Sequence, residues 1–166
     1  MYEHYPLGVV KRLVEVGFSL ENSIRYVVSE LNLPDTDFLE ILVQLSSEGA
    51  IDPITELTIF YEWKKALSRS KCKATVKQLA NFLWYLQWAI HRGMTLEDSI
   101  NLTMHLKHFA QSDTKVRDLK FIECQFSILG EENANYFFTC LRICCSHGGN
   151  VATLMKEMAF DLLETC

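Results

Sequence analysis

The sequence predicts an all-α protein, a helical bundle of about seven to eight helices that forms two related antiparallel helical modules. Three observations favour this fold class. Apolar side chains recur at helical spacing along most of the chain, and the alternation typical of strands is scarce. Most apolar segments also end at a glycine or proline that is followed by a residue able to cap a new helix. With only 7 glycines and 3 prolines, these breaks are few and can be placed.

The first module is predicted to span residues 1–69. Gly17 ends its first helix, because glycine adopts the left-handed conformation without steric cost, and Ser19 caps the second. Asp35, after Pro34, caps a third helix, and Asp52 with proline at the first helical position opens a fourth. The expected helical ranges are 7–16, 19–31, 36–46 and 53–67.

The second module is predicted to span residues 75–166, after a polar and basic linker at 68–74. Thr95 caps a helix, with an acidic residue three places on as in a capping box, and Asn150 caps the last helix. Glycines end several of these segments, most clearly at the pair Gly148 and Gly149. The expected helical ranges are 75–92, 95–110, 115–129, 131–146 and 150–166.

An internal repeat is the most informative feature of the sequence. Residues 17–24 (GFSLENSI) match residues 93–100 (GMTLEDSI) at five of eight positions, and the other three exchanges are conservative. Each copy fits a tight helical hairpin, in which glycine reverses the chain, Ser or Thr caps the new helix, and an acidic residue lies at the positive end of the helix dipole. A leucine, Leu20 or Leu96, is expected to pack beneath each turn.

A weaker echo follows each copy of the repeat. Residues 46–51 (SSEGAI) stand against residues 146–151 (SHGGNV), and each marks the end of one helix and the start of the next. The two echoes in the same order favour two related modules. Convergence of unrelated helical hairpins on the same capping residues is the alternative, and it stays open at this point.

The charge of the chain argues against nucleic acid as a partner. The net charge is −5 and the pI is about 5.5, whereas phosphate binding requires a basic surface. One basic stretch, residues 64–77, is interpreted as a solvated linker that could also touch anionic lipid headgroups. The sequence contains neither an apolar run long enough to span a membrane nor a secretion signal. We therefore expect a cytoplasmic protein whose six cysteines are reduced thiols.

One cluster invites a metal or nucleophile hypothesis. Cys140 and Cys144 are four residues apart, His147 could add a third zinc ligand, and Cys72 or Cys124 a fourth. Paired Cys-x-x-Cys spacing is absent, so we interpret these cysteines, with Cys145, as small residues of a buried helix. The histidine pair 105/108 is interpreted as a polar edge, and no cysteine is locally marked as an activated nucleophile. The sequence thus predicts no cofactor, no metal and no catalytic residues.

An aromatic stripe distinguishes the helix at 75–92. Trp84 and Trp88 lie four residues apart on one face, while leucines and Phe82 favour the others. A helix that is apolar nearly all round is either central to a bundle or has a second face for a partner. We favour the central position and keep the partner surface as the alternative.

The segments 79–86 and 93–100 together resemble the cytoplasmic domain of the type II secretion F family. That family includes the inner-membrane platform proteins of type IV and Tad pili. Its domains begin with a helix, a glycine and a second helix capped by a small residue, and close with an acidic or glycine-rich turn, which residues 146–151 resemble here. The likeness covers mainly residues 75–166, with a fainter version at 7–67. Family members carry transmembrane helices, which this chain lacks, and residues 111–132 look shortened.

The resemblance implies a bundle of roughly six helices, placed at the cytoplasmic face of the inner membrane and duplicated in the full-length protein. It also implies a non-enzymatic scaffold that docks an assembly ATPase, other inner-membrane assembly proteins and copies of itself. Residues expected to shape the turns or to form a partner surface are Gly17, Ser19, Glu21, Gly93, Thr95, Glu97, Gly148, Gly149, Asn150, Trp84 and Trp88. On this hypothesis the chain is a fragment cut before a membrane segment. Two alternatives stay open, a free-standing soluble helical adaptor or regulator, and a zinc- or thiol-dependent activity of the cysteine cluster.

Overall fold

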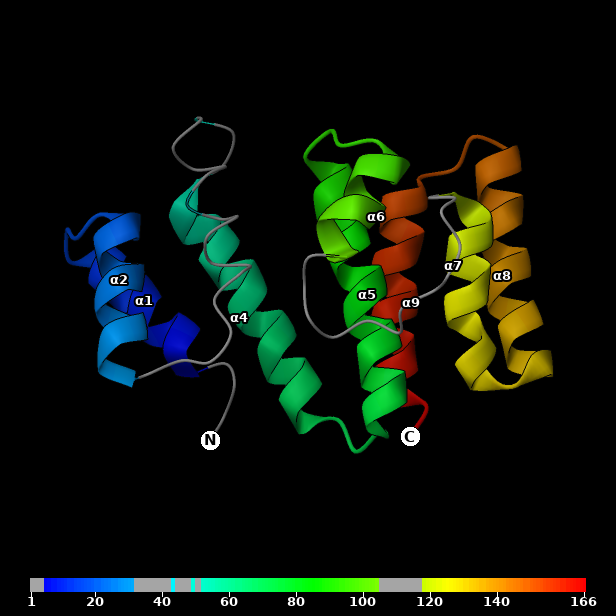
Figure 1. The fold of residues 1–166 in the computed structure, drawn as a ribbon, viewed down its shortest axis with the longest axis horizontal. Helices are drawn as coiled ribbons and strands as arrows, with labels where there is room; N and C mark the ends of the chain where they lie inside the picture. The colour runs from blue at the N-terminus through cyan, green and yellow to red at the C-terminus, as the bar shows by residue number, and fades with distance from the viewer. Residues whose placement is uncertain (1–4, 32–42, 44–48, 50–51, 105–117) are drawn as a thin grey trace. The chain divides into compact units, whose positions relative to one another are not determined.

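The computed structural model describes residues 5–31, 43, 49, 52–104 and 118–166 (Figure 1). Within these residues every regular element is a helix, so the all-α prediction is confirmed. The chain divides into two compact units, Met1–Arg69 and Ser70–Cys166, and the division falls inside the predicted linker at 68–74. None of the described helices combines the length and the apolar character that crossing a membrane requires.

In the first unit, α1 (Tyr5–Glu15) packs against both α2 (Leu20–Leu31) and α4 (Pro53–Arg69). The predicted helix at 36–46 lies outside the described residues, apart from residue 43. The apolar faces of α1, α2 and α4 supply the buried side chains. These are Leu7, Val10, Leu20, Ile24, Val27, Leu57, Phe60, Trp63 and Leu67.

Helix α4 begins directly after Asp52, as the sequence predicts, but its end differs from the prediction. The Thr55 hydroxyl donates to the carboxylate of Asp52, and the Asp52 carbonyl accepts from the amide of Glu56 at 3.1 Å. At the other end the helix continues to Arg69. The first residues of the predicted linker are therefore helical, because nothing in Ser68 or Arg69 breaks the hydrogen-bond ladder.

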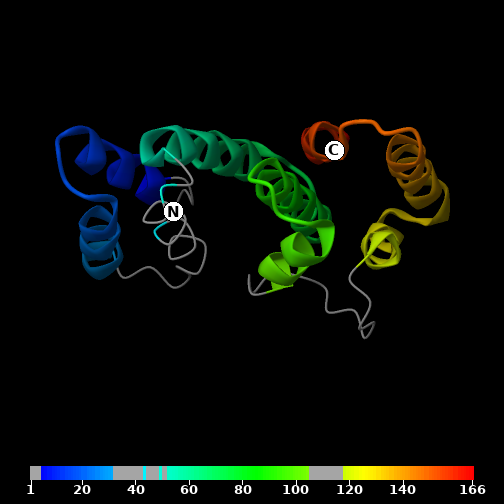
Figure 2. The same ribbon diagram turned by 90° about the horizontal axis from the view of Figure 1, so that it is seen from above.

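The second unit contains α5 (Ala74–His91), α6 (Leu96–Met104), α7 (Leu119–Phe126), the short 3-10 helix η1 (Ser127–Leu129), α8 (Glu131–Ser146) and α9 (Val151–Glu164). The most extensive helix packing in this unit joins α5 to α9. Helix α6 folds back on α5, and α8 lies beside α7, as both ribbon views show (Figures 1 and 2). Helix α8 also contacts α9.

Helix α5 is the core of its unit. Eleven consecutive residues, from Leu79 to Ala89, are buried, so no face of this stretch is left to solvent. Trp84 and Trp88 are only 1% and 2% exposed. Both indole rings are therefore buried, which agrees with the central position that the sequence favours.

The helix predicted at 115–129 is shorter in the structure. Asp118 is its N-cap, with the carboxylate accepting from the amide of Lys120 at 2.9 Å, and the α-helix ends at Phe126. The next turn tightens into η1, and Gly130 then reverses the chain with a φ of +85°. Residues 115–117 lie outside the described part of the chain.

The prediction that all six cysteines are reduced is wrong for two of them. Cys72 and Cys166 form a disulfide, with their Cα atoms 5.1 Å apart, whereas Cys124, Cys140, Cys144 and Cys145 are free. Because α5 and α9 pack antiparallel, the segment before α5, which contains Cys72, lies next to the segment after α9, which contains Cys166. The two cysteines are 94 residues apart in the sequence, so no local sequence pattern predicts their pairing.

Candidate functional site

The two copies of the repeat fold into the same turn, one in each unit. Gly17 and Gly93 have φ values of +109° and +86°, a conformation that favours glycine. The amide of Gly93 donates to the carbonyl of Ile90 at 3.0 Å, and the next amide donates to Ala89 at 3.3 Å. The equivalent bonds from Gly17 and Phe18 measure 3.1 and 3.0 Å. Each helix therefore ends in a Schellman motif that satisfies its last carbonyls.

The residue two places after each of these glycines caps the following helix. Ser19 Oγ accepts from the amide of Asn22 at 3.2 Å, and Thr95 Oγ1 accepts from the amide of Asp98 at 3.1 Å. These bonds satisfy one of the amides that every helix start leaves without an intrahelical partner. Both predicted caps are confirmed.

The inner face of each turn is closed by a serine and an isoleucine. Ser23 and Ser99 are both fully buried, and each hydroxyl donates at 2.7 Å to the carbonyl of the cap residue four places earlier. Ile24 and Ile100 are buried at the next position, 7% and 0% exposed. Leu20 is buried as expected, whereas Leu96 is only half-buried.

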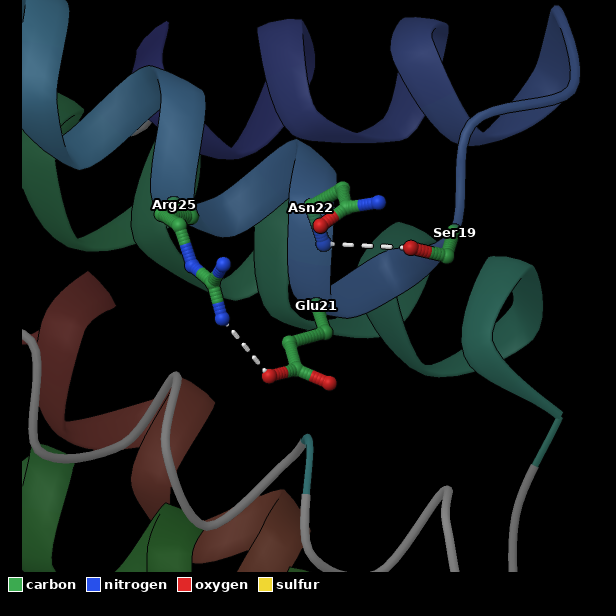
Figure 3. A network of polar contacts seen from close by, with 4 residues as sticks. All are labelled: Ser19, Glu21, Asn22 and Arg25. Carbon is green, nitrogen blue, oxygen red and sulfur yellow. Dashed lines mark hydrogen bonds and ion pairs between the residues drawn. The ribbon is translucent and has the colours of Figure 1, made fainter.

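The outer face of each turn carries the acidic residues. In the first unit, the exposed Glu21 pairs with the exposed Arg25, one helical turn further along α2, at 2.9 Å (Figure 3). In the second unit Glu97 is exposed too. Both carboxylates lie in the first turn of their helix, where the dipole favours negative charge.

A third turn, between α8 and α9, follows the same plan. Gly148 has a φ of +70°, the amide of Gly149 donates to the carbonyl of Cys144 at 2.9 Å, and Asn150 Oδ1 accepts from the amide of Thr153 at 3.1 Å. Its predicted counterpart at 46–51 lies outside the described residues except for Gly49, whose φ is +73°.

Gly149 is required by packing and not by its backbone angle. A Cβ atom at this position would stand 2.7 Å from Cys144 Sγ and 3.3 Å from the Cys144 carbonyl oxygen. At Gly17, Gly93 and Gly148 a Cβ would meet nothing within 4 Å, so the left-handed backbone alone selects glycine there. Gly148 is thus selected for its left-handed backbone, and Gly149 for the lack of space for a side chain.

Exposed apolar side chains surround the first turn, and the sequence reading missed them. Val16, Phe18 and Tyr26 are 73%, 45% and 49% exposed, and the rings of Phe18 and Tyr26 meet edge to face at 6.0 Å. In the second unit the position of Phe18 is taken by Met94, which is half-buried. The exchange of Phe for Met keeps the position apolar, so the sequence carries no signal of this exposure. A smaller exposed pair, Tyr136 and Ile143, lies on α8.

The cysteine cluster on α8 is half-buried, so it does not form the fully buried core that the sequence suggested. Within α8 only Leu141 is buried, while Cys140, Cys144 and Cys145 are intermediate. His147 is exposed at the C-cap, where its amide donates to the Ile143 carbonyl. Across the described residues no group of three or more His, Cys, Asp or Glu side chains is placed to hold a metal ion.

The described thiols give little support to nucleophilic chemistry. Burial, with a smaller contribution from neighbouring Cys144, raises the pKa of the Cys145 thiol above its ordinary value of 9.0. A reactive cysteine needs the opposite shift, because the thiolate is the nucleophile. Cys72, considered as a fourth metal ligand, is engaged in the disulfide, and Cys124 lies exposed on α7. His4, His105 and His108 lie outside the described residues.

Comparisons of the chain with protein-family models, with curated proteins and with solved structures found no match.

Proposed function

We propose that this chain is a non-enzymatic scaffold that docks protein partners through its helical hairpins, as the cytoplasmic domain of a platform protein for type IV pilus assembly or type II secretion. Its partners would be an assembly ATPase and other inner-membrane assembly proteins. On this proposal the chain works at the cytoplasmic face of the inner membrane and transmits force or position without covalent chemistry.

The observation that carries the proposal is the repeated hairpin. Residues 17–24 and 93–100 form the same Schellman turn, the same cap and the same buried serine in two separate compact units. Convergence on capping residues would account for the glycine, the cap and the acidic residue of each turn, but the match also extends to the buried serine and isoleucine that follow. Two modules that start alike support a duplicated architecture of the platform type.

The arrangement of side chains at these turns also supports a docking role. Each hairpin buries its serine and isoleucine inward and leaves an acidic residue, Glu21 or Glu97, on the outside. The first turn adds the exposed side chains of Val16 and Phe18, and the ring of Phe18 meets that of the exposed Tyr26. Apolar area next to fixed charge is the usual composition of a protein-binding surface.

A comparative pull-down tests the proposal. The purified chain is immobilised, incubated with a bacterial lysate, and the retained proteins are identified by mass spectrometry. A Glu21→Lys, Glu97→Lys double variant reverses the outer charges without touching either cap. Glu157→Lys, at an exposed position of α9, is the matched control for a charge reversal elsewhere.

Recovery of a secretion or pilus ATPase, or of its neighbouring assembly proteins, by the natural chain and by Glu157→Lys is the expected result. The double variant should retain several-fold less. If repeated experiments recover only unrelated soluble proteins, the chain is better described as the free-standing helical adaptor. Equal recovery of an assembly protein by all three chains would keep the scaffold and remove the hairpin turns as its docking surface.

A further inference from the structure

The disulfide joins the two ends of the α5–α9 pair. Cys72 lies two residues before α5, and Cys166 lies two residues after α9. Because the two helices are the most extensively packed pair in their unit, the bond closes a loop that contains nearly all of that unit. The bond therefore links the start of the central helix to the last turn of α9.

The same segment is also held to α9 by contacts that do not depend on the disulfide. The Ser70 hydroxyl donates to the carbonyl of Leu163 at 3.1 Å and accepts from the amide of Cys72 at 3.2 Å. Cys72 Sγ lies 3.3 Å from the carbonyl oxygen of Leu162. A reduced Cys72 would find a hydrogen-bond acceptor already in place, since a thiol is a weak donor.

The two sulfur-bearing residues differ in their access to solvent. Cys72 is 7% exposed, whereas Cys166 is classed as exposed and follows the last helical residue. An incoming reagent is therefore expected to reach Cys166 more readily than Cys72.

We propose that Cys72 and Cys166 form a reversible thiol–disulfide pair, which a cellular dithiol reduces by attack on the Cys166 sulfur. The positions of the two residues support this assignment, since Cys166 is an exposed residue and Cys72 is buried against carbonyl acceptors. This role rests on the proposed function for its cytoplasmic location, where a disulfide is usually transient and catalytic or redox-sensing.

The exchange balances as two successive displacements. One thiolate of the dithiol attacks Cys166 Sγ, a mixed disulfide forms, and the Cys72–Cys166 bond breaks with its electron pair on Cys72, which then takes a proton from solvent. The second thiolate of the same reagent attacks the reagent's own bridged sulfur and releases Cys166. The dithiol is oxidised to a disulfide, and the cysteine pair gains two electrons and two protons.

Reduction should loosen only the end of α9. Leu162 and Ala159, 1% and 0% exposed, stay packed in the unit in either state, and Ser70 keeps its bond to Leu163. The amide of Thr165, which donates to the Asp161 carbonyl at 3.1 Å, lies closest to the released residue. The inferred switch thus frees the residues after α9 while the core of the unit remains folded.

The first experiment counts and locates thiols in the full chain. The protein is exposed to oxidised glutathione, treated or not with dithiothreitol, labelled with N-ethylmaleimide, and mapped by peptide mass spectrometry. We expect labels at Cys124, Cys140, Cys144 and Cys145 before reduction and at Cys72 and Cys166 only after it. Labelling of Cys72 and Cys166 in the oxidised sample would overturn the proposal.

A second experiment tests which sulfur is attacked. In Cys72→Ser the remaining Cys166 should form a mixed disulfide with glutathione at least about tenfold faster than Cys72 does in Cys166→Ser, because access governs the reaction. The serine at 72 keeps a hydroxyl for the Leu162 carbonyl, so this variant should fold. Equal rates, or faster reaction at Cys72, would refute the assignment of Cys166 as the attacked sulfur.

A third measurement reads out the structural effect. Reduction should abolish hydrogen-exchange protection at the Thr165 amide, lower but not abolish that of α5, and lower the unfolding temperature by about 10 °C or more. Cys166→Ser should behave as the reduced chain in both conditions. Cys124→Ser, which removes an exposed free thiol, is the matched control and should respond to reductant as the natural chain does. If reduction abolishes the protection of α5 as well, the bond is a structural staple and no reversible switch.

Discussion

Ser23 and Ser99 occupy matching positions in the two units, each fully buried and each donating its hydroxyl at 2.7 Å to the carbonyl of a cap residue. The caps, Ser19 and Thr95, are exposed and accept from the amide three places on. One turn therefore uses two hydroxyl-bearing residues for different tasks. The cap satisfies an amide at the start of the helix, and the buried serine fits under the turn without an unpaired polar group.

Removing a cap should destabilise its own unit. Ser19→Ala and Thr95→Ala each leave one amide without its side-chain acceptor, at an expected cost of about 0.5–2 kcal/mol in the free energy of unfolding. Urea denaturation, with hydrogen exchange resolved to each unit, measures the loss. Ser29→Ala, at an exposed interior position of α2, is the matched control and should be neutral or slightly stabilising, since alanine favours helix. A cap variant that matches this control would show that the cap bonds contribute nothing.

The glycines at the turns should tolerate asparagine better than alanine. Gly93 has a φ of +86° and open space where a Cβ would lie, so the penalty for Gly93→Ala is backbone strain of about 1–2 kcal/mol. Gly93→Asn should cost less, because asparagine visits the left-handed region more readily. Urea midpoints of the two variants decide the point. The reverse order would mean that side-chain crowding governs the position.

The cost at Gly149 should arise from one neighbour. Its added Cβ would stand 2.7 Å from Cys144 Sγ, so Gly149→Ala should lose roughly 1–3 kcal/mol through overpacking. Cys144→Ala removes that sulfur and should recover part of the loss. The tight contact of 3.3 Å with the carbonyl oxygen of residue 144 would remain. A double-mutant cycle on urea unfolding measures this coupling. Strict additivity of the two changes would contradict the steric explanation.

The hairpins could be predicted from the sequence because their causes are local. A left-handed glycine, a cap and a buried serine lie within eight residues, and each acts on backbone groups at most five residues away. The range of α8, Glu131–Ser146, follows for the same reason from Gly130 at one end and Gly148 at the other. The short α7 was misjudged because Asp118 lies in a polar stretch with no apolar break to mark it.

The disulfide and the exposed apolar patch could not be predicted in the same way. Cys72 and Cys166 meet only because α5 and α9 pack together, and that packing depends on side chains distributed over the whole second unit. Exposure of Phe18 similarly depends on how α1 and α2 turn their faces. The half-buried state of the α8 cysteines has the same origin, since helical spacing alone does not say which faces find a partner.

The Cys145 thiol should make stability depend on alkaline pH. Burial and then Cys144 raise its folded pKa above 9.0, so the unfolded chain releases this proton at a lower pH than the folded chain. Between the two pKa values the unfolded state binds fewer protons, and the free energy of unfolding falls as the pH rises. The full contribution is present below about pH 9 and is lost as the pH passes through the folded value.

Urea unfolding of the natural chain and of Cys145→Ser, measured at several pH values from about 8 to 11, checks this dependence. The variant should lose less stability than the natural chain over this range. Cys124→Ser serves as the control for the loss of an exposed thiol. If Cys145→Ser and the natural chain follow parallel curves, the alkaline loss has another source.

The ion pair between Glu21 and Arg25 should stabilise the fold less than the location of Glu21 at the start of α2 does. Arg25 and Glu21 are 67% and 64% exposed, so solvent screens their 2.9 Å contact, and Arg25→Ala should change the free energy of unfolding by less than about 0.5 kcal/mol. Glu21 also lies in the first turn of α2, where the helix dipole adds about 0.3–1 kcal/mol. Glu21→Gln should therefore cost at least as much as Arg25→Ala.

Urea unfolding of the two variants at low and at high salt measures how much of each loss is electrostatic, because salt screens both contributions. A loss well above 1 kcal/mol for Arg25→Ala would mean that the arginine has a structural role beyond the pair. A small loss for both variants would leave the outer face of the hairpin free to change without unfolding the unit. In that case reduced partner capture by Glu21→Lys reports a lost contact with the partner and not a damaged fold.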